Sequence, residues 1–301
     1  MSRHALADEE WVRLAPLLPA HPRQGHRWSD HRTVIDGILF RTRTGCPWRD
    51  LPPVFGNWKT VYGRHRRWSL DGTWQQILDV LRAGCDEAEG PDWTVSIDST
   101  VVRAHQHAAG ARRCRPPIWS GGAAPNDKNL PGGGTNREAL GRSRGGLTTK
   151  IHLAADRRCR PVTSVLSPGQ RGDSPRFIPL LGQIRIRRRG PGRPRTRPGR
   201  AMGDKAYSSA ANRAYLRRRG IAAVIPVKED QKEHRRARGR RGGRPPVFDS
   251  TRYKERNTVE RCFSKLKQFR AVATRYDKRE PIYQGTVDIA SIRIWLRDPV
   301  P

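Results

Sequence analysis

Residues 94–102, TVSIDSTVV, determine how the rest of the chain is interpreted. Val95 and Ile97 alternate with Ser96 and Asp98, and this period of two predicts a β-strand with one apolar and one polar face. The residues before this strand follow a helical period instead. We therefore expect residues 1–90 to form one domain and residues 91–301 to form another.

The amino-terminal domain is expected to be all-helical, because apolar residues recur at helical spacing in four segments. Asp30 is the predicted cap of the second helix and Gly45 its end, and the third helix is predicted to start at Asn57. Arg64 and Arg67 fall outside the apolar face of the third helix, so both are expected to contact DNA. Short helices with basic outer faces are typical of a helix-turn-helix-like module, although a helical dimerisation domain has the same pattern.

After the first strand the pattern changes between strands and helices. Strands at 148–155 and 162–166 predict an antiparallel three-stranded meander together with residues 94–102. A helix from Asp173 or Ser174, a strand ending at Asp204, a helix capped by Ser208 and a buried strand at 221–227 follow. This order is that of a ribonuclease-H-like fold, so we predict an α+β protein with a mixed-sheet catalytic core behind the all-helical domain. Basic, Gly-rich and Pro-rich residues at about 106–146 and 228–250 predict two mobile loops.

The charge of the chain indicates its partner. The chain has 60 Lys and Arg residues and 28 acidic residues, so its formal net charge is +32. This excess of positive charge favours nucleic acid as the partner. An apolar run of about 18 residues and a signal peptide are both missing from the sequence, so we expect a cytoplasmic, nucleoid-associated protein without membrane contact. Its five cysteines lie far apart and do not predict a zinc site.

Three acidic residues are candidates for a catalytic cluster. Asp98 and Asp204 lie at the polar ends of predicted strands, where an isolated Asp is more often a turn or cap residue. A long helix predicted at 251–270 places Glu260 beside an apolar face containing Val259 and Phe263, and burial of that face would turn Glu260 toward both aspartates. Carboxylates hold the divalent cations that phosphoryl transfer on DNA requires. A plain amphipathic helix, with Arg256 and Glu260 as a weak surface pair, is the alternative.

Several motifs resemble one known family. Tyr253-x2-Arg256-x3-Glu260-x6-Lys267 resembles the Y-R-E-K signature of insertion-sequence DDE transposases. SIDSTVVRAH (96–105) and GDKAYSS (203–209) are similar to the segments that carry the first and second Asp of that family. GRSRGGLTTKIH (141–152) and ASIRIWLR (290–297) resemble the insertion-sequence-five group, whereas residues 113–134 and the last four residues depart from it.

The resemblance implies a function. It implies Asp98, Asp204 and Glu260 as catalytic ligands of two Mg²⁺ ions, or of Mn²⁺, and it implies that Tyr253, Arg256 and Lys267 position DNA or the carboxylates. Arg142 and Arg144, within the 141–152 motif, are further expected DNA contacts. The implied reaction is cleavage of double-stranded DNA at the terminal inverted repeats and 3′-OH strand transfer by a homodimer or higher oligomer. An inactivated, transposase-derived DNA-binding protein and a ribonuclease-H-like nuclease without strand transfer remain the alternatives.

Overall fold

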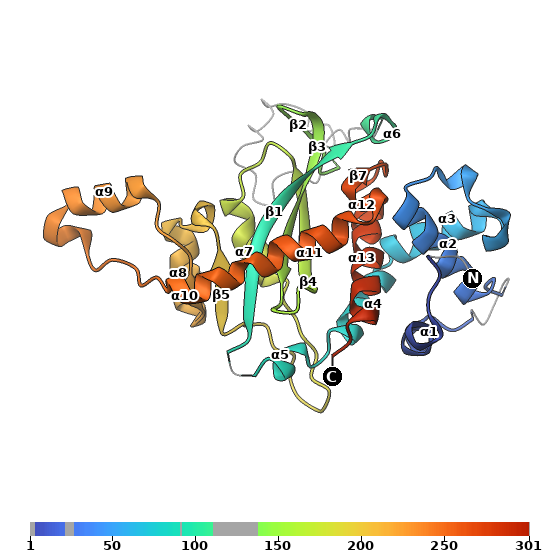
Figure 1. Cartoon of the computed structure of the whole chain (residues 1–301), viewed down its shortest axis with the longest axis horizontal. Coiled ribbons are helices and arrows are strands. Elements are labelled where there is room, and N and C mark those ends of the chain that lie inside the picture. Colours follow the sequence, from blue (N-terminus) through green and yellow to red (C-terminus); the bar gives the residue numbers. More distant parts are fainter. Residues whose placement is uncertain (1–3, 22–26, 91, 111–137, 301) are drawn as a thin grey trace, which may run out of the picture.

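The computed structural model describes residues 4–21, 27–90, 92–110 and 138–300. A mixed β-sheet lies at the centre, the amino-terminal helices lie at one end, and helix α9 (Glu229–Ala237) projects from the opposite end (Figure 1). The carboxy-terminal helix α13 (Glu280–Arg297) lies between the sheet and the amino-terminal helices (Figure 1). The sequence therefore folds into a mixed α/β arrangement, as predicted.

The amino-terminal helices begin and end where their local signals predict. Asp30 accepts a hydrogen bond from the Thr33 N–H at 2.7 Å, and Gly45 ends the same helix with a φ of 72°, which favours glycine. Asn57 caps the third helix by accepting from the Lys59 N–H at 2.9 Å. The helices of this segment are α1 (Asp8–Leu14), α2 (His31–Thr44), α3 (Trp58–Leu70), α4 (Thr73–Leu81) and α5 (Cys85–Ala88).

The sheet contains the predicted meander. Its strands are β1 (Thr94–Ala104), β2 (Gly141–Ser143), β3 (Gly146–Ala155), β4 (Pro161–Pro168), β5 (Arg200–Gly203), β6 (Ala222–Val224) and β7 (Thr274–Arg275). β3 pairs antiparallel with both β1 and β4, which confirms the meander. β5 pairs parallel with β1, and β6 pairs parallel with β5, so the sheet is mixed. β5 ends at Gly203, opposite Ile97, whereas β1 continues to Ala104, so the predicted strand end at Asp98 is wrong and Asp98 lies within β1, beside the carboxyl end of β5.

Several predicted boundaries are wrong. The expected loop at 106–146 contains helix α6 (Gln106–Ala109) and strand β2, while residues 111–137, with the departing stretch 113–134, lie outside the described residues. The expected loop at 228–250 contains α9, which no apolar periodicity marks because none of its residues is buried. Ser209 rather than Ser208 caps the helix after Asp204, by accepting from the Asn212 N–H at 3.2 Å.

The long helix predicted at 251–270 is divided. A 3-10 turn at Lys254–Arg256 follows α10 (Ser250–Tyr253), and α11 (Asn257–Lys267) ends before α12 (Arg270–Ala273). Asp249 caps the short first piece by accepting from the Arg252 N–H at 3.0 Å. The remaining helices are α7 (Phe177–Gly182) and α8 (Ala210–Arg219). None of the helices in the described ranges is long and apolar enough to cross a membrane.

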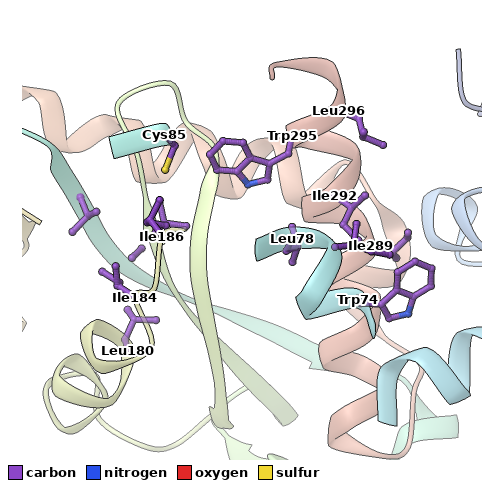
Figure 2. Packing of buried hydrophobic residues seen from close by; sticks show 14 of the residues in the cluster. Trp74, Leu78, Cys85, Leu180, Ile184, Ile186, Ile289, Ile292, Trp295 and Leu296 are labelled. Carbon is purple, nitrogen blue, oxygen red and sulfur yellow. The ribbon is translucent and has the colours of Figure 1, made fainter. Parts of the chain in front are cut away.

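Buried apolar side chains cover both faces of the sheet. On one face, Val102 and Leu153 pack with Val259 and Phe263 of α11 and with Tyr283 of α13. On the other face, a second cluster joins strand β1 to the amino-terminal helices, and Figure 2 shows α13 packed against α4 within this cluster. Its labelled members from these two helices are Trp74, Leu78, Ile289, Ile292, Trp295 and Leu296.

This shared cluster bears on the domain boundary. The segment 1–90 packs its apolar side chains against α13, which belongs to the segment 91–301. An isolated fragment 1–90 would expose that surface to water. The division at residue 90 therefore stays a prediction.

Candidate active site

Strand register brings the two aspartates together. Ile97 of β1 lies opposite Gly203 of β5, so the next residues, Asp98 and Asp204, follow at the same sheet edge. The Asp98 carboxylate accepts from the Ser99 N–H at 2.8 Å, and the Asp204 carboxylate accepts from the Ala206 N–H at 2.9 Å. A Cβ on Gly203 would lie 3.0 Å from the Tyr207 ring, so only glycine fits there without a shift. Local backbone bonds thus hold both carboxylates at the edge.

Helix α11 brings the third acid to this edge. Its buried residues Val259 and Phe263 face the sheet, and the Thr258 hydroxyl donates to the Ser96 hydroxyl oxygen at 2.9 Å, which fixes the start of α11 to β1. The Glu260 side chain remains 54% exposed beside this anchor. Glu260 is linked to β1 through Arg256, which bonds both Glu260 and Asp98.

Arg256 bridges two of the acids. Its Nη2 donates to Asp98 Oδ2 at 2.7 Å, and its Nη1 donates to Glu260 Oε1 at 2.9 Å. Burial raises the pKa of the Asp98 carboxyl, and the charges of Asp204 and Glu260 add to this rise, while the Ser99 N–H and Arg256 oppose it. The three carboxylates therefore lie close enough to influence one another, and the guanidinium offsets part of their repulsion.

The acid set suits a hard cation by its chemistry. Oxygen ligands from carboxylates are those that Mg²⁺ and Mn²⁺ prefer, and the Asp98 side chain is 22% exposed, so the edge is open to solvent. Within the described ranges, no three acidic, His or Cys side chains are gathered closely enough to hold a metal ion. Arg256 instead takes the position between Asp98 and Glu260. The three carboxylates are suitable ligands for a divalent ion. In the observed structure, the Arg256 guanidinium bonds two of them, Asp98 and Glu260.

The other residues of the Y-R-E-K motif lie along the same side. Tyr253 ends α10, where burial raises the pKa of its phenol and the three acids add to the rise, so its ring lies beside them. Lys267 ends α11, two helical turns beyond Glu260, and in the part of the chain that the structure describes no carboxylate pairs with its amine. Burial lowers the pKa of the Lys267 amine.

The remaining predicted DNA contacts are distant from the acids or buried. Arg142 is exposed on β2, and Arg144 is exposed in the turn that follows. Both lie at the end of the sheet where β3 pairs with Arg103, five residues beyond Asp98 in β1. Arg67 is exposed on α3. These three side chains are accessible to a partner.

The expected exposure of Arg64 is wrong. Its side chain is buried, its guanidinium carbon lies 4.0 Å from the centre of the Trp28 ring, and its Nη1 lies 2.7 Å from His31 Nδ1. Burial lowers the pKa of Arg64 to about 10. Trp28 precedes the helix to which His31 belongs and covers Arg64, which helical periodicity does not reveal. Arg64 is a packing residue in this fold.

A buried polar network beside Asp98 was missed by the sequence analysis. The Ser99 hydroxyl donates to Asp173 Oδ1 at 2.7 Å, and the Lys150 amine donates to the same oxygen at 2.9 Å. His152 lies opposite Ser99 in the register and shares a hydrogen bond of 2.8 Å with the Ser167 hydroxyl. Lys150 and His152 alternate with apolar residues on β3, and that alternation was the signal in the sequence. The network supports β1 from the face opposite the three acids.

Comparison with known proteins identifies the family. Residues 89–285 match the family model described as a transposase DDE domain, which covers more than half of the chain. The chain therefore belongs to the transposases with a DDE domain. Residues 6–78 match the family model of putative transposases of the IS4/5 family, which confirms the resemblance in the sequence. Proteins with this domain act on DNA and generally use divalent metal ions.

Individual relatives agree with this assignment. The uncharacterized protein y4sN of Sinorhizobium fredii (strain NBRC 101917 / NGR234) is 38% identical over 127 residues, 40% of this chain and 97% of the relative. The uncharacterized 16.2 kDa protein of insertion element IS402 from Burkholderia cepacia is 34% identical over 112 residues, 35% of this chain and 76% of the relative. The putative transposase for insertion sequence element IS6501 from Brucella ovis (strain ATCC 25840 / 63/290 / NCTC 10512) is 28% identical over 151 residues, 50% of this chain and 100% of the relative. No solved structure matches the chain.

Proposed function

We propose that this transposase cleaves DNA strands at the terminal inverted repeats of its element and joins the 3′-OH ends to target DNA. The observation that carries the proposal is the position of Arg256, which bonds Asp98 and Glu260 at the edge where Asp204 also lies. Asp98, Asp204 and Glu260 come from separate parts of a chain that carries a large excess of positive charge. Charge repulsion among carboxylates is costly unless a cation takes part, so this edge suits a cation-dependent site.

In this proposal Asp98, Asp204 and Glu260 hold two Mg²⁺ ions. When bound, such ions activate the attacking oxygen and stabilise the leaving oxygen of a phosphodiester. The Ser99 and Ala206 N–H groups orient the carboxylates of Asp98 and Asp204. Arg256 orients Glu260 and Asp98, so it is a positioning residue. Tyr253 and Lys267, on the same side, hold the DNA backbone, with Lys267 pairing with a phosphate.

The wider architecture supports the same proposal. The antiparallel meander of β1, β3 and β4 is followed by the parallel strands β5 and β6, which is the strand order of a ribonuclease-H-like core. The exposed side of α3 carries Lys59, Arg66 and Arg67, which fits a helix-turn-helix-like element that binds the ends of the transposable element. We further propose that the protein works as a homodimer or higher oligomer on DNA, because two ends must be brought together.

The test uses the full-length protein and the DNA that flanks its gene. Wild-type protein with Mg²⁺ is expected to cut the element ends, and with pre-cut ends it is expected to join them to a target plasmid. Asp98→Asn, Asp204→Asn and Glu260→Gln should each abolish both steps and leave end-binding nearly intact, because each removes a charge but little volume. Glu255→Gln, an exposed acid on the neighbouring turn, is the matched control and should remain active.

Three outcomes would contradict the proposal. Wild-type protein that binds ends but never cuts with Mg²⁺ or Mn²⁺ would indicate a DNA-binding protein derived from a transposase. Cutting without joining of pre-cut ends would indicate a nuclease. Full turnover by any one of the three acid variants would remove that residue from the site.

A further inference from the structure

The arm, residues 228–248, projects from the body of the protein. It contains α9, a 3-10 turn at Gly239–Gly242 and a returning segment, and Figure 1 shows α9 extending away from the sheet. None of the residues in α9 or in the 3-10 turn is buried. A helix of nine residues spans about 14 Å, so the arm reaches well beyond the sheet edge. A projecting element that buries nothing does not stabilise the fold by packing.

Charge along the arm is separated. The acidic residues Glu229, Asp230 and Glu233 lie in the first half of α9, near the body. Residues 235–244 contain six arginines and no acidic residue. Arg238, Arg240 and Arg241 line an open hollow at the tip. Only the far half of the arm therefore attracts an anion.

The tip arginines differ from those of the body. In the body, Arg41, Arg160 and Arg256 each pair with a carboxylate within 3.0 Å. Among the described residues, no ion pair involves any arginine at positions 235–244, and those at 236, 238, 240, 241 and 244 are exposed. These exposed arginines outnumber the acidic residues of the arm, so the arm carries a cationic surface.

Both ends of the arm contact the segments that carry the candidate site residues. Near its start, the Gln231 side chain forms a hydrogen bond with the Ser208 hydroxyl, four residues after Asp204. Near its end, the Phe248 ring lies 5.3 Å from the ring of Tyr253, three residues before Arg256, which bonds Asp98 and Glu260. The base of the arm is therefore part of the rim of the candidate active site.

We propose that the arm binds the phosphate backbone of the DNA duplex that flanks the phosphodiester held at Asp98, Asp204 and Glu260. This inference rests on the proposed function for the position of the cut, but the contact itself requires no catalysis. DNA carries one negative charge per about 1.7 Å of helix axis. The tip of the arm lies about 14 Å from the base of the arm, so DNA that follows the arm brings several phosphates to the tip. Guanidinium groups bind phosphate in bidentate geometry, so the arginines of the tip suit the DNA backbone.

The test measures the salt dependence of binding. Full-length protein is titrated into a fluorescent 30-base-pair duplex at several KCl concentrations, and the slope of log Kobs against log[KCl] is recorded. R236Q, R238Q, R240Q and R241Q are combined in one variant, which removes four exposed charges. The slope is expected to become shallower by about 3 to 4, because each lost phosphate contact accounts for about 0.9.

The matched control removes the same charge elsewhere. R185Q, R187Q, R189Q and R193Q neutralise four exposed arginines in the segment between α7 and β5, none of which has an ion pair in the described ranges. This control is expected to change the slope by less than 1. Equal slopes for the arm variant and the control would overturn the proposal, because charge alone would then explain binding.

Cutting assays separate this inference from the proposed function. If the salt-dependence slope of the arm variant is shallower than that of wild type, and wild-type protein shows no cutting with Mg²⁺, the arm contact stands and the proposed function fails. If wild-type protein cuts and the arm variant keeps the wild-type slope, the proposed function stands and the arm contact fails. Since none of the four substituted residues is buried, thermal unfolding of the variant should match wild type.

Discussion

The buried ion pair between Arg41 and Asp277 is expected to be one of the most sensitive points of the fold. Arg41 Nη2 donates to Asp277 Oδ1 at 3.0 Å, and the Thr286 hydroxyl donates to Oδ2 at 2.8 Å. The two ionic side chains are only 3% and 5% exposed. Burial raises the pKa of Asp277, but Arg41, His65 and Thr286 outweigh that effect and hold the pKa below its usual range. The pair is therefore ionised, and it ties α2 to the segment before α13.

Asp277→Asn keeps the shape of the side chain but leaves the Arg41 guanidinium buried without its counter-charge. The expected cost is about 3–5 kcal/mol of unfolding free energy, the range for removal of one partner of a buried pair. Replacing both partners, with Arg41→Met and Asp277→Leu, should cost less than Asp277→Asn alone, because no uncompensated charge remains. Asp8→Asn breaks an exposed pair with Arg32 and should have no measurable effect.

Urea unfolding of the full-length chain, followed by tryptophan fluorescence, measures these differences. The reasoning predicts the order wild type, double variant, Asp277→Asn from most to least stable. A loss below about 1 kcal/mol for Asp277→Asn would refute it, since removing one partner would then not leave a buried charge uncompensated. A double variant less stable than the single variant would refute the charge argument as well.

Three more predictions concern single side chains. Lys267→Ala should raise the DNA concentration for half-maximal joining, and excess Mg²⁺ should not restore it; rescue by Mg²⁺ alone would contradict the phosphate contact. Arg256→Lys should slow cutting by roughly 10- to 100-fold with DNA affinity unchanged, since one ammonium does not replace a guanidinium that bonds two acids, and single-turnover cutting with a filter-binding control measures this. Burial lowers the pKa of His65 to about 4, so unfolding takes up a proton below about 6.5 and stability falls as pH drops from there toward 4. Urea titrations give the unfolding free energy at pH 7.5 and at pH 5. The difference between these two values should be about 2 kcal/mol smaller in His65→Gln than in wild type or in the exposed control His107→Gln. Equal differences in all three proteins would contradict the burial of His65.

Features set by neighbouring residues were predictable from the sequence. Asp30, Gly45 and Asn57 act on backbone groups within a few positions, so their capping roles depend little on the rest of the fold. The apolar face around Val259 predicted the buried side of α11, whereas the alternation around Val95 did not reveal that Thr94 and Ser96 are buried too. The helix pattern alone left a plain amphipathic helix open, and the three acids were expected as a site because the motifs resemble those of the DDE transposases.

Features set by distant residues were not predictable. Arg64 is buried because Trp28 and His31 cover it, although it lies on the polar side of its helix pattern. Ser99 and Asp173 meet only because β1 and the segment after β4 are brought together by folding. Helix α9 carries no apolar stripe, so hydrophobic periodicity could not reveal it, although its Glu, Gln, Lys and Arg residues are good helix formers.

The central claim is that Asp98, Asp204 and Glu260 together hold the two Mg²⁺ ions. Fe²⁺ in place of Mg²⁺, with ascorbate and peroxide, generates hydroxyl radicals that cut the protein backbone close to the bound ion. We predict fragments of the 34.1 kDa chain from cuts near residues 98, 204 and 260, suppressed by excess Mg²⁺, lost in Asp98→Asn and retained in Glu255→Gln. Cuts at other positions, or cuts near residue 98 that persist in Asp98→Asn, would contradict this claim.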